Sequence, residues 1–452
     1  MSEGNHLTKN TIQLTNKNHM EIPWVKVTDD NGETPSIKSS LKEKSTIIGR
    51  VGIILLSCGT GAWRVRDSMN SIARILGVTC STDIGLVTIE YTCFDKHRSI
   101  THSLSLPSSG VNTDKLSEME SFVKGFEKEG AFLSVKEVHK LLDKISQKKP
   151  NYRPFIQGLA AALACSAFVF LLGGGPVEMF CSFFGAGLGN WLKSTMNSKH
   201  MTLFAGLSAG VALACLTYLM ISRGLELTFD INVGHEAGYI GSMLFAIPGF
   251  PFITSGLDIA KSDMRSGIER LVHAVTIILV ATLVGWIVAL ASDLTPDKFI
   301  PLGLSPLTLM LLRLPASFCG VFGFSIMFNS PKKMAATAGL IGAFANTLRL
   351  ELVDLTSMPP AAAAFLGALT AGLLASFVHK QMGYPRISLT VPSIVIMVPG
   401  LYMYRAMYYV GVGTIASGAQ WFINAAMIVL FLPLGLILAR IIMDPDWRYS
   451  GY

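Results

Sequence analysis

Charged side chains follow a broken apolar segment at residues 246–267, which read AIPGFPFITSGLDIAKSDMRSG. Pro248 and Gly249 interrupt the apolar run, because proline removes a backbone donor and glycine lowers the cost of leaving a helix. Asp258, Asp263 and Arg265 come soon afterwards. They are candidates for a proton relay or a gate, since ionisable groups in an apolar environment tend to be functional. The same three charges are equally compatible with a solvated loop.

A second segment repeats this pattern. Residues 396–418 read IMVPGLYMYRAMYYVGVGTIASG, with Pro399 and Gly400 in the same place and a Ser-Gly pair at the same distance beyond the proline. Upstream of each segment lies a stretch that starts with proline and ends with an asparagine followed by a base. These stretches are PVEMFCSFFGAGLGNWLK, with Asn190, and PKKMAATAGLIGAFANTLR, with Asn346. Two matches in the same order predict an internal duplication.

Both segments supply candidates for a substrate path. Backbone groups freed by a break are tolerated at membrane depth only where they are buried in protein or line a wet cavity, so they could bind a small zwitterion. A packing kink is the alternative for each proline, and an interhelical hydrogen bond for each asparagine. Arg405, near the outer end of its predicted helix, is either solvated or part of the path. The candidates are Asn190, Pro248, Gly249, Asn346, Pro399, Gly400 and Arg405.

The composition places these residues in a membrane protein. Only 15% of the 452 residues are charged, whereas soluble domains carry about 25%. Residues 1–153 are polar and charge-rich, so the deficit lies in the remainder. Apolar stretches of bilayer length predict ten transmembrane helices, of which the second is the weakest. They lie at about 155–174, 177–193, 201–222, 239–257, 268–291, 306–328, 332–350, 358–378, 388–409 and 421–442.

Lysine and arginine are concentrated in one set of alternate joints between these stretches. The positive-inside rule therefore predicts that the N-terminal region and the C-terminus are both cytoplasmic, in a plasma (inner) membrane. The net charge of +7 is then mostly a topology signal. No basic stripe with interleaved aromatic residues indicates nucleic acid as a partner.

The predicted fold is mostly α. Each half of the membrane part has five helices, and an odd number places the halves upside down relative to each other, as in many secondary transporters. We expect ten helices in two inverted five-helix repeats, at 154–292 and 293–452. A disordered tail at 1–43 and a small cytoplasmic α+β domain at 44–153 come first, because GLVTIEYTCF and SITHSLSLP alternate as strands do. A membrane scaffold without transport activity is the alternative.

Motifs for nucleotide or zinc chemistry are absent from the sequence. It contains no G-x-x-x-x-G-K-[ST] and no H-E-x-x-H. The seven cysteines include no C-x-x-C pair and are expected to be packing residues. We therefore expect no enzymatic activity, no metal site and no cofactor, and transport driven by an ion gradient fits what remains.

The sequence resembles the threonine/serine exporter family over about residues 45–443. The resemblance is carried by LLSCGTGAWRVRDSMNSIARILGV, FFGAGLGNWL and PGFPFITSGLDIAKSDMRSGIERL, and by PRISLTVPSIVIMVPGLYMYRAMYYV. The last stretch is similar to a smaller partner domain that some relatives encode separately, so this chain is a fused form. The resemblance implies efflux of small polar metabolites driven by the proton motive force: L-threonine and L-serine in some members, succinate in two-subunit relatives.

The resemblance also assigns residues by position. Arg66 departs from it, because relatives often have an acid there, which puts in doubt any hydrolase-like role of the N-terminal domain. The positions that match the family's two Pro-Gly segments are Pro248, Gly249, Asp258, Asp263 and Gly267, then Pro392, Pro399 and Gly400.

Together these observations predict a secondary-active exporter of small polar metabolites, most of all L-threonine and L-serine. One alternative is a dicarboxylate exporter, which an essential Arg265, Arg313 or Arg405 would favour. A membrane-anchored enzyme or signalling module that uses the N-terminal domain is the other. The expected partners are a small-molecule substrate, protons and the lipid bilayer, with a homo-oligomer left open.

Overall fold

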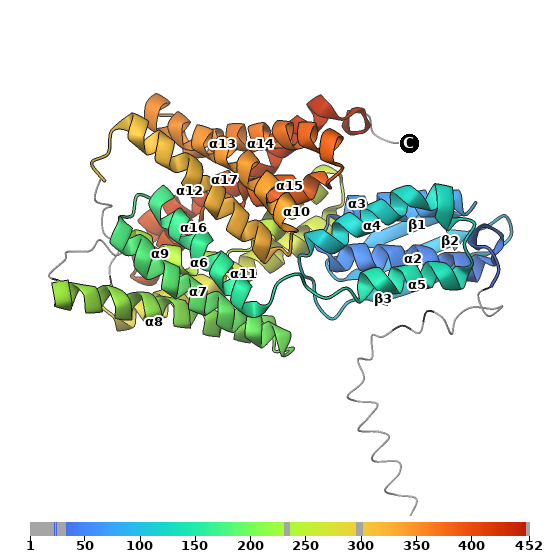
Figure 1. The fold of residues 1–452 in the computed structure, drawn as a ribbon, viewed down its shortest axis with the longest axis horizontal. Helices are drawn as coiled ribbons and strands as arrows, with labels where there is room; N and C mark the ends of the chain where they lie inside the picture. Colours follow the sequence, from blue (N-terminus) through green and yellow to red (C-terminus); the bar gives the residue numbers. More distant parts are fainter. Residues whose placement is uncertain (1–21, 23, 25–32, 230–235, 295–301, 449–452) are drawn as a thin grey trace, which may run out of the picture. The chain divides into compact units, whose positions relative to one another are not determined.

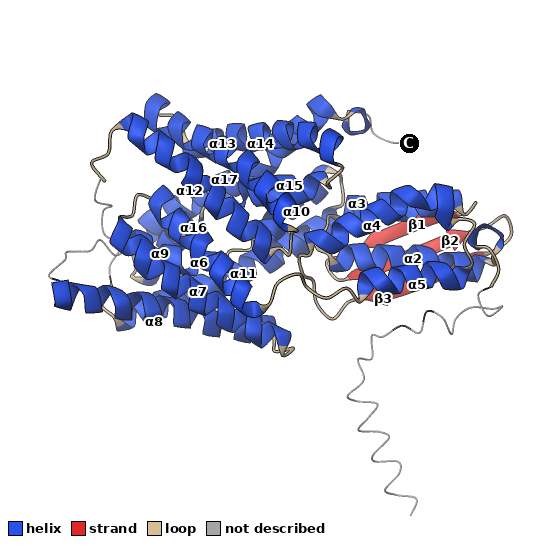
Figure 2. Cartoon of the chain, viewed as in Figure 1, coloured by secondary structure: helices blue, strands red, loops and turns tan. Residues whose placement is uncertain are grey.

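The computed structural model describes residues 22, 24, 33–229, 236–294 and 302–448. Most of the tail predicted at 1–43 lies outside these residues. The chain is mostly helical (Figure 2) and divides into two compact units. We call Met1–Gly110 with Glu118–Lys148 the sheet unit, and Val111–Ser117 with Lys149–Tyr452 the helical unit.

The sheet unit contains a three-stranded antiparallel sheet in the order β1-β2-β3 (Figure 1). Its strands are β1 (Thr79–Ile84), β2 (Thr88–Phe94) and β3 (Ser99–Ser105). Alternation in the sequence predicted the last two but not β1. The other elements are η2 (Ser36–Lys38), α2 (Leu41–Ser57), α3 (Ala62–Ile75), η3 (Phe126–Gly130) and α5 (Val135–Ser146). Helix α4 (Thr113–Gly125) begins in the segment 111–117 of the helical unit and continues in the sheet unit.

Helix α2 is the centre of the sheet unit, and nearly all of its residues are buried. It packs on β2 and β3 and also contacts α3 and α5. Gly49 allows the sheet to approach, since a Cβ there would lie 2.0 Å from the Tyr91 hydroxyl. That hydroxyl donates to the Ser45 carbonyl at 2.8 Å. Ser40 begins the helix with a capping box, which satisfies its free N–H groups.

The helical unit contains the remaining elements. They are α6 (Pro154–Leu171), α7 (Pro176–Ser198), α8 (Leu203–Phe229), α9 (Glu236–Met243), η4 (Leu244–Ala246), α10 (Gly249–Ala260), α11 (Met264–Ala291), α12 (Pro306–Met327), α13 (Lys332–Thr356), α14 (Pro360–Met382), α15 (Arg386–Val395), α16 (Gly400–Gly411), α17 (Ile415–Met443) and η5 (Pro445–Trp447).

Many of these helices suit a bilayer. Within the described residues, α6, α8, α11, α12, α14 and α17 are each long and apolar enough to span it, and two bent helix pairs raise the number to eight. Helices α7 and α13 are also long but fall outside that set. Six to eight candidate spans make the chain a multi-pass membrane protein, while the sequence predicts ten.

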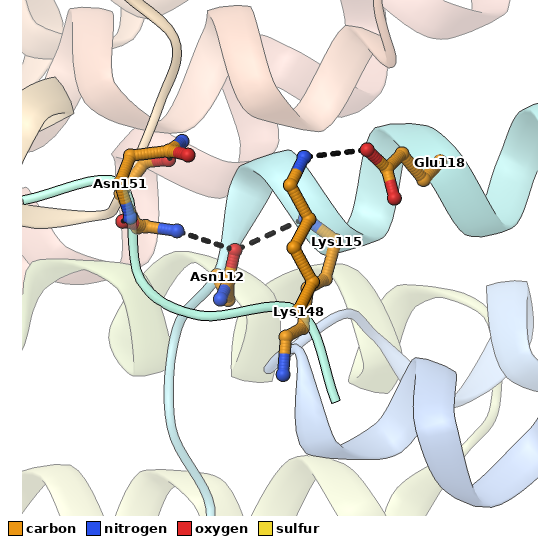
Figure 3. Close-up of polar contacts among 6 residues, drawn as sticks. Asn112, Lys115, Glu118, Lys148 and Asn151 are labelled. Carbon is orange, nitrogen blue, oxygen red and sulfur yellow. Dashed lines mark hydrogen bonds and ion pairs between the residues drawn. The ribbon is translucent and has the colours of Figure 1, made fainter. Parts of the chain in front are cut away.

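Asparagines fasten the segment 111–117 to the other parts of the helical unit. The Asn329 amide donates to Asn112 Oδ1 at 3.0 Å, and the Asn151 N–H donates to Asn329 Oδ1 at 2.7 Å. Figure 3 shows Asn112 also accepting from the Lys115 N–H at 3.0 Å. Asn329 lies after α12 with a φ of 64°, a left-handed conformation that asparagine tolerates well.

Candidate functional site

Two helix pairs of the helical unit are sharply bent. Helix α9 continues through η4 into α10 with a bend of 62°, and α15 continues into α16 with a bend of 48°. Pro248 and Pro399 lie at the two breaks and supply no N–H to a helix. The sequence therefore located both breaks.

Each break has the same backbone turn. Pro248 has φ −82° and ψ 59°, and Pro399 has φ −81° and ψ 60°. The Gly249 N–H donates to the Ile247 carbonyl at 2.9 Å, and the Gly400 N–H donates to the Val398 carbonyl at 2.9 Å. A hydrogen bond across one residue with these angles is an inverse γ-turn, here centred on each proline.

The two breaks also fit into each other. A Cβ on Gly249 would lie 2.1 Å from Val395 Cγ2, and one on Gly400 would lie 2.1 Å from Ile247 Cδ1 and 2.7 Å from Leu244 Cδ2. Each glycine thus leaves room for a side chain that precedes the other proline. We call the contact of Gly249 with Val395, and of Gly400 with Leu244 and Ile247, the crossing.

A second matched turn follows at the same distance beyond each proline. The Asp263 N–H donates to the Asp258 carbonyl, and the Thr414 N–H donates to the Tyr409 carbonyl, both at 2.9 Å. Gly267 and Gly418 come next. A Cβ on either would be about as close to the preceding helix, 2.5 Å from Ile259 and 2.6 Å from Val410.

A small cavity adjoins the crossing. Its volume is about 20 Å³, which is room for about one water molecule. Helices α11 and α16 and the segment before Pro248 provide the lining, which is almost wholly apolar: Met243, Leu244, Ile247, Ile278, Ala281, Thr282, Gly400 and Met403. The crossing is therefore closed around a space too small for an amino acid.

An ion pair joins the two bent pairs. Arg405 of α16 donates from Nε and Nη2 to the two carboxylate oxygens of Glu236, the first residue of α9, both at 2.6 Å. The guanidinium also lies 4.6 Å from the ring centroid of Trp421. Glu236 is buried, so this bidentate pair is of the strong kind. Tyr239 and Tyr404 pack edge to face beside it.

A second ion pair joins α10 to α11. Arg270 Nε lies 3.2 Å from Asp258 Oδ2 and donates to Ser266 Oγ at 3.0 Å, while Ser266 donates to the same carboxylate oxygen at 3.0 Å. Asp258 is 0% and Arg270 2% exposed. A buried pair like this one is tolerable only because its remaining polar atoms are hydrogen-bonded.

The other predicted gate residues differ in environment. Asp263 is buried and precedes the first turn of α11, where a carboxylate is favourable near the helix N-terminus. Arg265 lies 3.3 Å from Glu269, and both side chains are 40% or more exposed. The structure therefore brings Asp258 into a buried cluster and leaves Arg265 in a solvent-exposed pair.

The two predicted asparagines bond to the helix that precedes theirs. Asn190 Nδ2 donates to the Gln157 carbonyl of α6 at 2.8 Å, and Asn346 Nδ2 donates to Ser317 Oγ of α12 at 2.9 Å. Both are buried. These contacts match the alternative that the sequence left open, an interhelical hydrogen bond.

A base follows each asparagine, and sequence analysis did not select either one. Lys193 Nζ lies 5.5 Å from the centroid of the Phe245 ring, next to the break in the first bent pair. No acid of the described residues lies within ion-pair distance of Lys193. Arg349 Nε donates to Asn346 Oδ1 at 3.0 Å. Their shared position after the repeated asparagine is the signal that could have found them.

Two ion-pair partners were also missed. Neither Glu236 nor Arg270 was among the candidates that the sequence indicated. The sequence contains no sign of either pairing, because it depends on how separate helices pack. Arg313 has partners as well: it lies 2.7 Å from Glu351 and contacts Asp354.

The sheet unit contains a largely buried cluster of ionisable groups around Arg50. Arg50 donates to the His139 carbonyl at 3.0 Å, contacts the His139 ring nitrogen at 3.1 Å and pairs with Asp143. Burial lowers the pKa of His139 to about 4, with the Arg50 charge acting in the same direction. Within the described residues, no group of three or more His, Cys, Asp or Glu side chains could hold a metal ion.

Two family descriptions match the sequence. "Putative threonine/serine exporter" matches residues 46–292, and "Threonine/Serine exporter, ThrE" matches residues 314–442. Each matched segment contains one bent pair. No solved structure matches the chain.

Individual relatives are distant. The chain is 23% identical over 419 residues to the "Probable threonine/serine exporter" of Mycobacterium tuberculosis, covering 89% of this chain and 76% of that one. It is 24% identical over 244 residues to the "Probable succinate transporter subunit YjjP" of Escherichia coli, covering 53% and 90%. The "Pheromone-regulated membrane protein 10" of Debaryomyces hansenii is 21% identical over 384 residues, covering 80% and 36%.

Proposed function

The chain belongs to the threonine/serine exporter family, and on that premise we propose that it is a secondary-active exporter driven by the proton motive force. Small polar metabolites are the substrates, with L-threonine and L-serine first. The observation that carries the proposal is the crossing, where two proline-centred turns pack into each other. Discontinuous helices of this kind form the substrate sites of many secondary transporters.

We further propose that the helical unit consists of ten membrane helices in two inverted five-helix halves. The matched γ-turns, the matched second turns and the reciprocal glycine contacts support this relation. The path runs between the halves, past Pro248 and Gly249 in one and Pro399 and Gly400 in the other. Both termini are cytoplasmic, in a plasma (inner) membrane, as the basic joints predict.

Each ion pair closes one end of this path. The Glu236–Arg405 pair ties the two bent pairs together at the outer end, and the Asp258–Arg270 pair ties α10 to α11 at the cytoplasmic end. A proton taken up by Asp258 removes its attraction for Arg270, so protonation favours opening of that end. Asp263, whose N–H bonds to the Asp258 carbonyl, is the second candidate for the relay.

Lys193 and Arg349 supply positive charge for a substrate carboxylate. Lys193 lies beside a break and has no described acid as an ion-pair partner. Such a charge costs free energy in a membrane unless an anion binds to it. The pair also occupies equivalent positions in the two proposed halves. A cation from each half offers the same carboxylate a contact in either inward or outward conformation.

A dicarboxylate exporter is the second candidate. The positive charges of Lys193 and Arg349 beside the path favour it, and the name of the Escherichia coli relative includes succinate. A second carboxylate would need a second cation, and Lys193 together with Arg349 provides two. The two candidates therefore share one path and differ in what the substrate presents to it.

Efflux from vesicles that contain the purified protein tests the proposal. Vesicles loaded with labelled L-threonine, L-serine or succinate receive a proton gradient, with and without an uncoupler. We expect efflux of threonine and serine that the uncoupler abolishes. Efflux of succinate alone would establish the second candidate, and efflux of none of the three would overturn both.

A matched pair of variants controls for nonspecific leak. Gly400→Leu fills the space that Leu244 and Ile247 occupy at the crossing, whereas Gly224→Leu adds a side chain where nothing lies within 4 Å. The first variant is expected to stop efflux and the second to leave it unchanged. Equal loss of efflux in both variants would mean that transport does not depend on the crossing.

A further inference from the structure

Two cysteines lie opposite each other on neighbouring strands of the sheet unit. Cys80 of β1 is the direct partner of Cys93 of β2 in the antiparallel register. Cys93 is 0% exposed, and Cys80 is partly exposed on β1. Because β1 has a neighbour on one side only, Cys80 can be reached from the edge of the sheet. Both thiols are free in this structure.

The hydrogen-bond pattern shows what kind of pair this is. Directly opposed residues in an antiparallel ladder alternate between hydrogen-bonded and non-hydrogen-bonded pairs. The Gly85 N–H donates to the Thr88 carbonyl at 2.9 Å, so Gly85 and Thr88 form a hydrogen-bonded pair. Counting back along the register from that pair makes Cys80 and Cys93 a non-hydrogen-bonded pair.

That class of pair brings the two side chains close together. Opposed α-carbons of a non-hydrogen-bonded pair are about 4.5 Å apart, which lies within the range that disulfide bonds accept. A bond between the two sulfurs therefore needs no change of strand register. A hydrogen-bonded pair would hold its α-carbons about 1 Å farther apart.

The two thiols are also chemically unequal. The neighbouring Cys93 thiol lowers the pKa of the Cys80 thiol below its ordinary value despite partial burial. The proximity of Cys80, together with burial, raises the pKa of the Cys93 thiol. An accessible thiol with a lowered pKa next to a second thiol is the arrangement found in redox-active cysteine pairs.

We propose that Cys80 and Cys93 are a reversible thiol–disulfide modification site, with a low-molecular-weight disulfide as oxidant. The Cys80 thiolate attacks one sulfur of that disulfide, which releases one small thiolate and leaves a mixed disulfide on Cys80. Cys93 then loses its proton and attacks the Cys80 sulfur, which expels the second small thiolate. Two protein thiols and one small disulfide become one protein disulfide and two small thiols.

Mass spectrometry of the full-length protein, purified in detergent and treated with oxidised glutathione, tests this site. Trypsin cuts after Arg74 and Lys96, so both cysteines lie in one peptide. We expect that peptide to lose two hydrogens and to resist alkylation. Cleavage after Glu90 separates the two cysteines along the chain, so the halves should stay joined until dithiothreitol is added.

Three variants make the outcome decisive. Cys93→Ser should stop the reaction at Cys80 with glutathione attached, and Cys80→Ser should leave Cys93 unmodified. Cys319→Ser, on α12, is the matched control and should keep the full bond. The proposal is overturned if glutathione stays on Cys80 while Cys93 remains a free thiol in the unaltered protein. It is also overturned if neither cysteine reacts while the protein stays folded.

Discussion

The two bent pairs share a backbone and differ in their charges. Pro248 and Pro399 adopt the same turn within 1° in both angles, and a second matched turn follows each. Where the first pair has the buried acid Asp258, however, the second has Tyr409 at the same distance from its proline. Proline and glycine therefore set the geometry, while the residues added beyond them decide which break contains a buried charge.

The ion pairs differ in a related way. Asp258 of α10 and Arg270 of α11 join two helices that follow each other directly in the chain. Glu236 and Arg405 connect one bent pair with the other. The first contact is thus local in the chain, and the second can form only when the two bent pairs are packed together. Loss of each should have a different consequence.

The largest effect is expected from Arg270→Met. Removing the guanidinium leaves a buried carboxylate without its partner, which costs about 3–5 kcal/mol. Tyr409→Phe, at the position of the second bent pair that matches Asp258, removes no charge and should cost far less. The midpoint of thermal unfolding in detergent measures both, and equal midpoints would mean that the two breaks do not differ as their charges suggest.

Asp258→Asn refines the same comparison. The amide can still accept from Ser266 but no longer takes up a proton or carries charge. If Asp258 couples protons to transport, efflux by this variant should lose most of its dependence on pH, whereas Tyr409→Phe should keep it. An unchanged pH profile in Asp258→Asn would reduce the pair to a structural role.

A smaller loss is expected where the two bent pairs meet. Arg405→Lys keeps the positive charge but loses the bidentate contact with Glu236 and the stacking on Trp421. We expect a coupling energy with Glu236 of about 2 kcal/mol, measured by a double-mutant cycle with Glu236→Gln. Because this pair ties the bent pairs together, the variant should also leak substrate when no gradient is present. A coupling energy near zero would show that the contact does not hold them.

Much of the fold could be predicted because its signals are local. Every predicted span overlaps a helix or a bent pair, although α7 and α13 are outside the set of candidate spans, and Pro-Gly located both bends. Strand β1 was missed because TCSTDI has no large apolar residue before its last position, so alternation is hard to recognise. The sequence alone also could not show that the breaks pack into each other, since this depends on contacts between distant segments.

The ion pairs show more clearly what could not be predicted from the sequence. Arg265 and Arg270 are both basic residues near the start of α11, and the sequence analysis selected Arg265 as a gate candidate but not Arg270, which pairs with Asp258. Residues four apart share a helix face, so Ser266 and Arg270 point together toward Asp258, while Arg265 is directed elsewhere. The position of each arginine around the axis of α11 therefore determines which one pairs with Asp258. The sequence could not show this, because it does not show which face of α11 packs against α10.

A still smaller effect on stability is expected from alanine at the crossing. Gly249→Ala and Gly400→Ala each place a Cβ about 2.1 Å from a side chain of the opposite break, which costs about 1–3 kcal/mol through overpacking. The double variant should lose less than the sum, because one displacement makes room for both. Gly224→Ala is the control. An additive double variant would mean that the two glycines do not share one contact.

The smallest effect on stability, but a clear one on transport, is expected at the two bases. Lys193→Met removes a charge that no described acid balances, so the unfolding midpoint should stay the same or rise. Loss of a charge-assisted contact worth about 1.5–3 kcal/mol should raise the KM for serine efflux by roughly 10- to 100-fold, and Arg349→Met should act in the same direction. Lys199→Met, at the exposed end of α7, should do neither. Serinol, the amino alcohol without the carboxylate, separates substrate binding from packing: if Lys193→Met slows serinol as much as serine, the lysine does not bind the carboxylate.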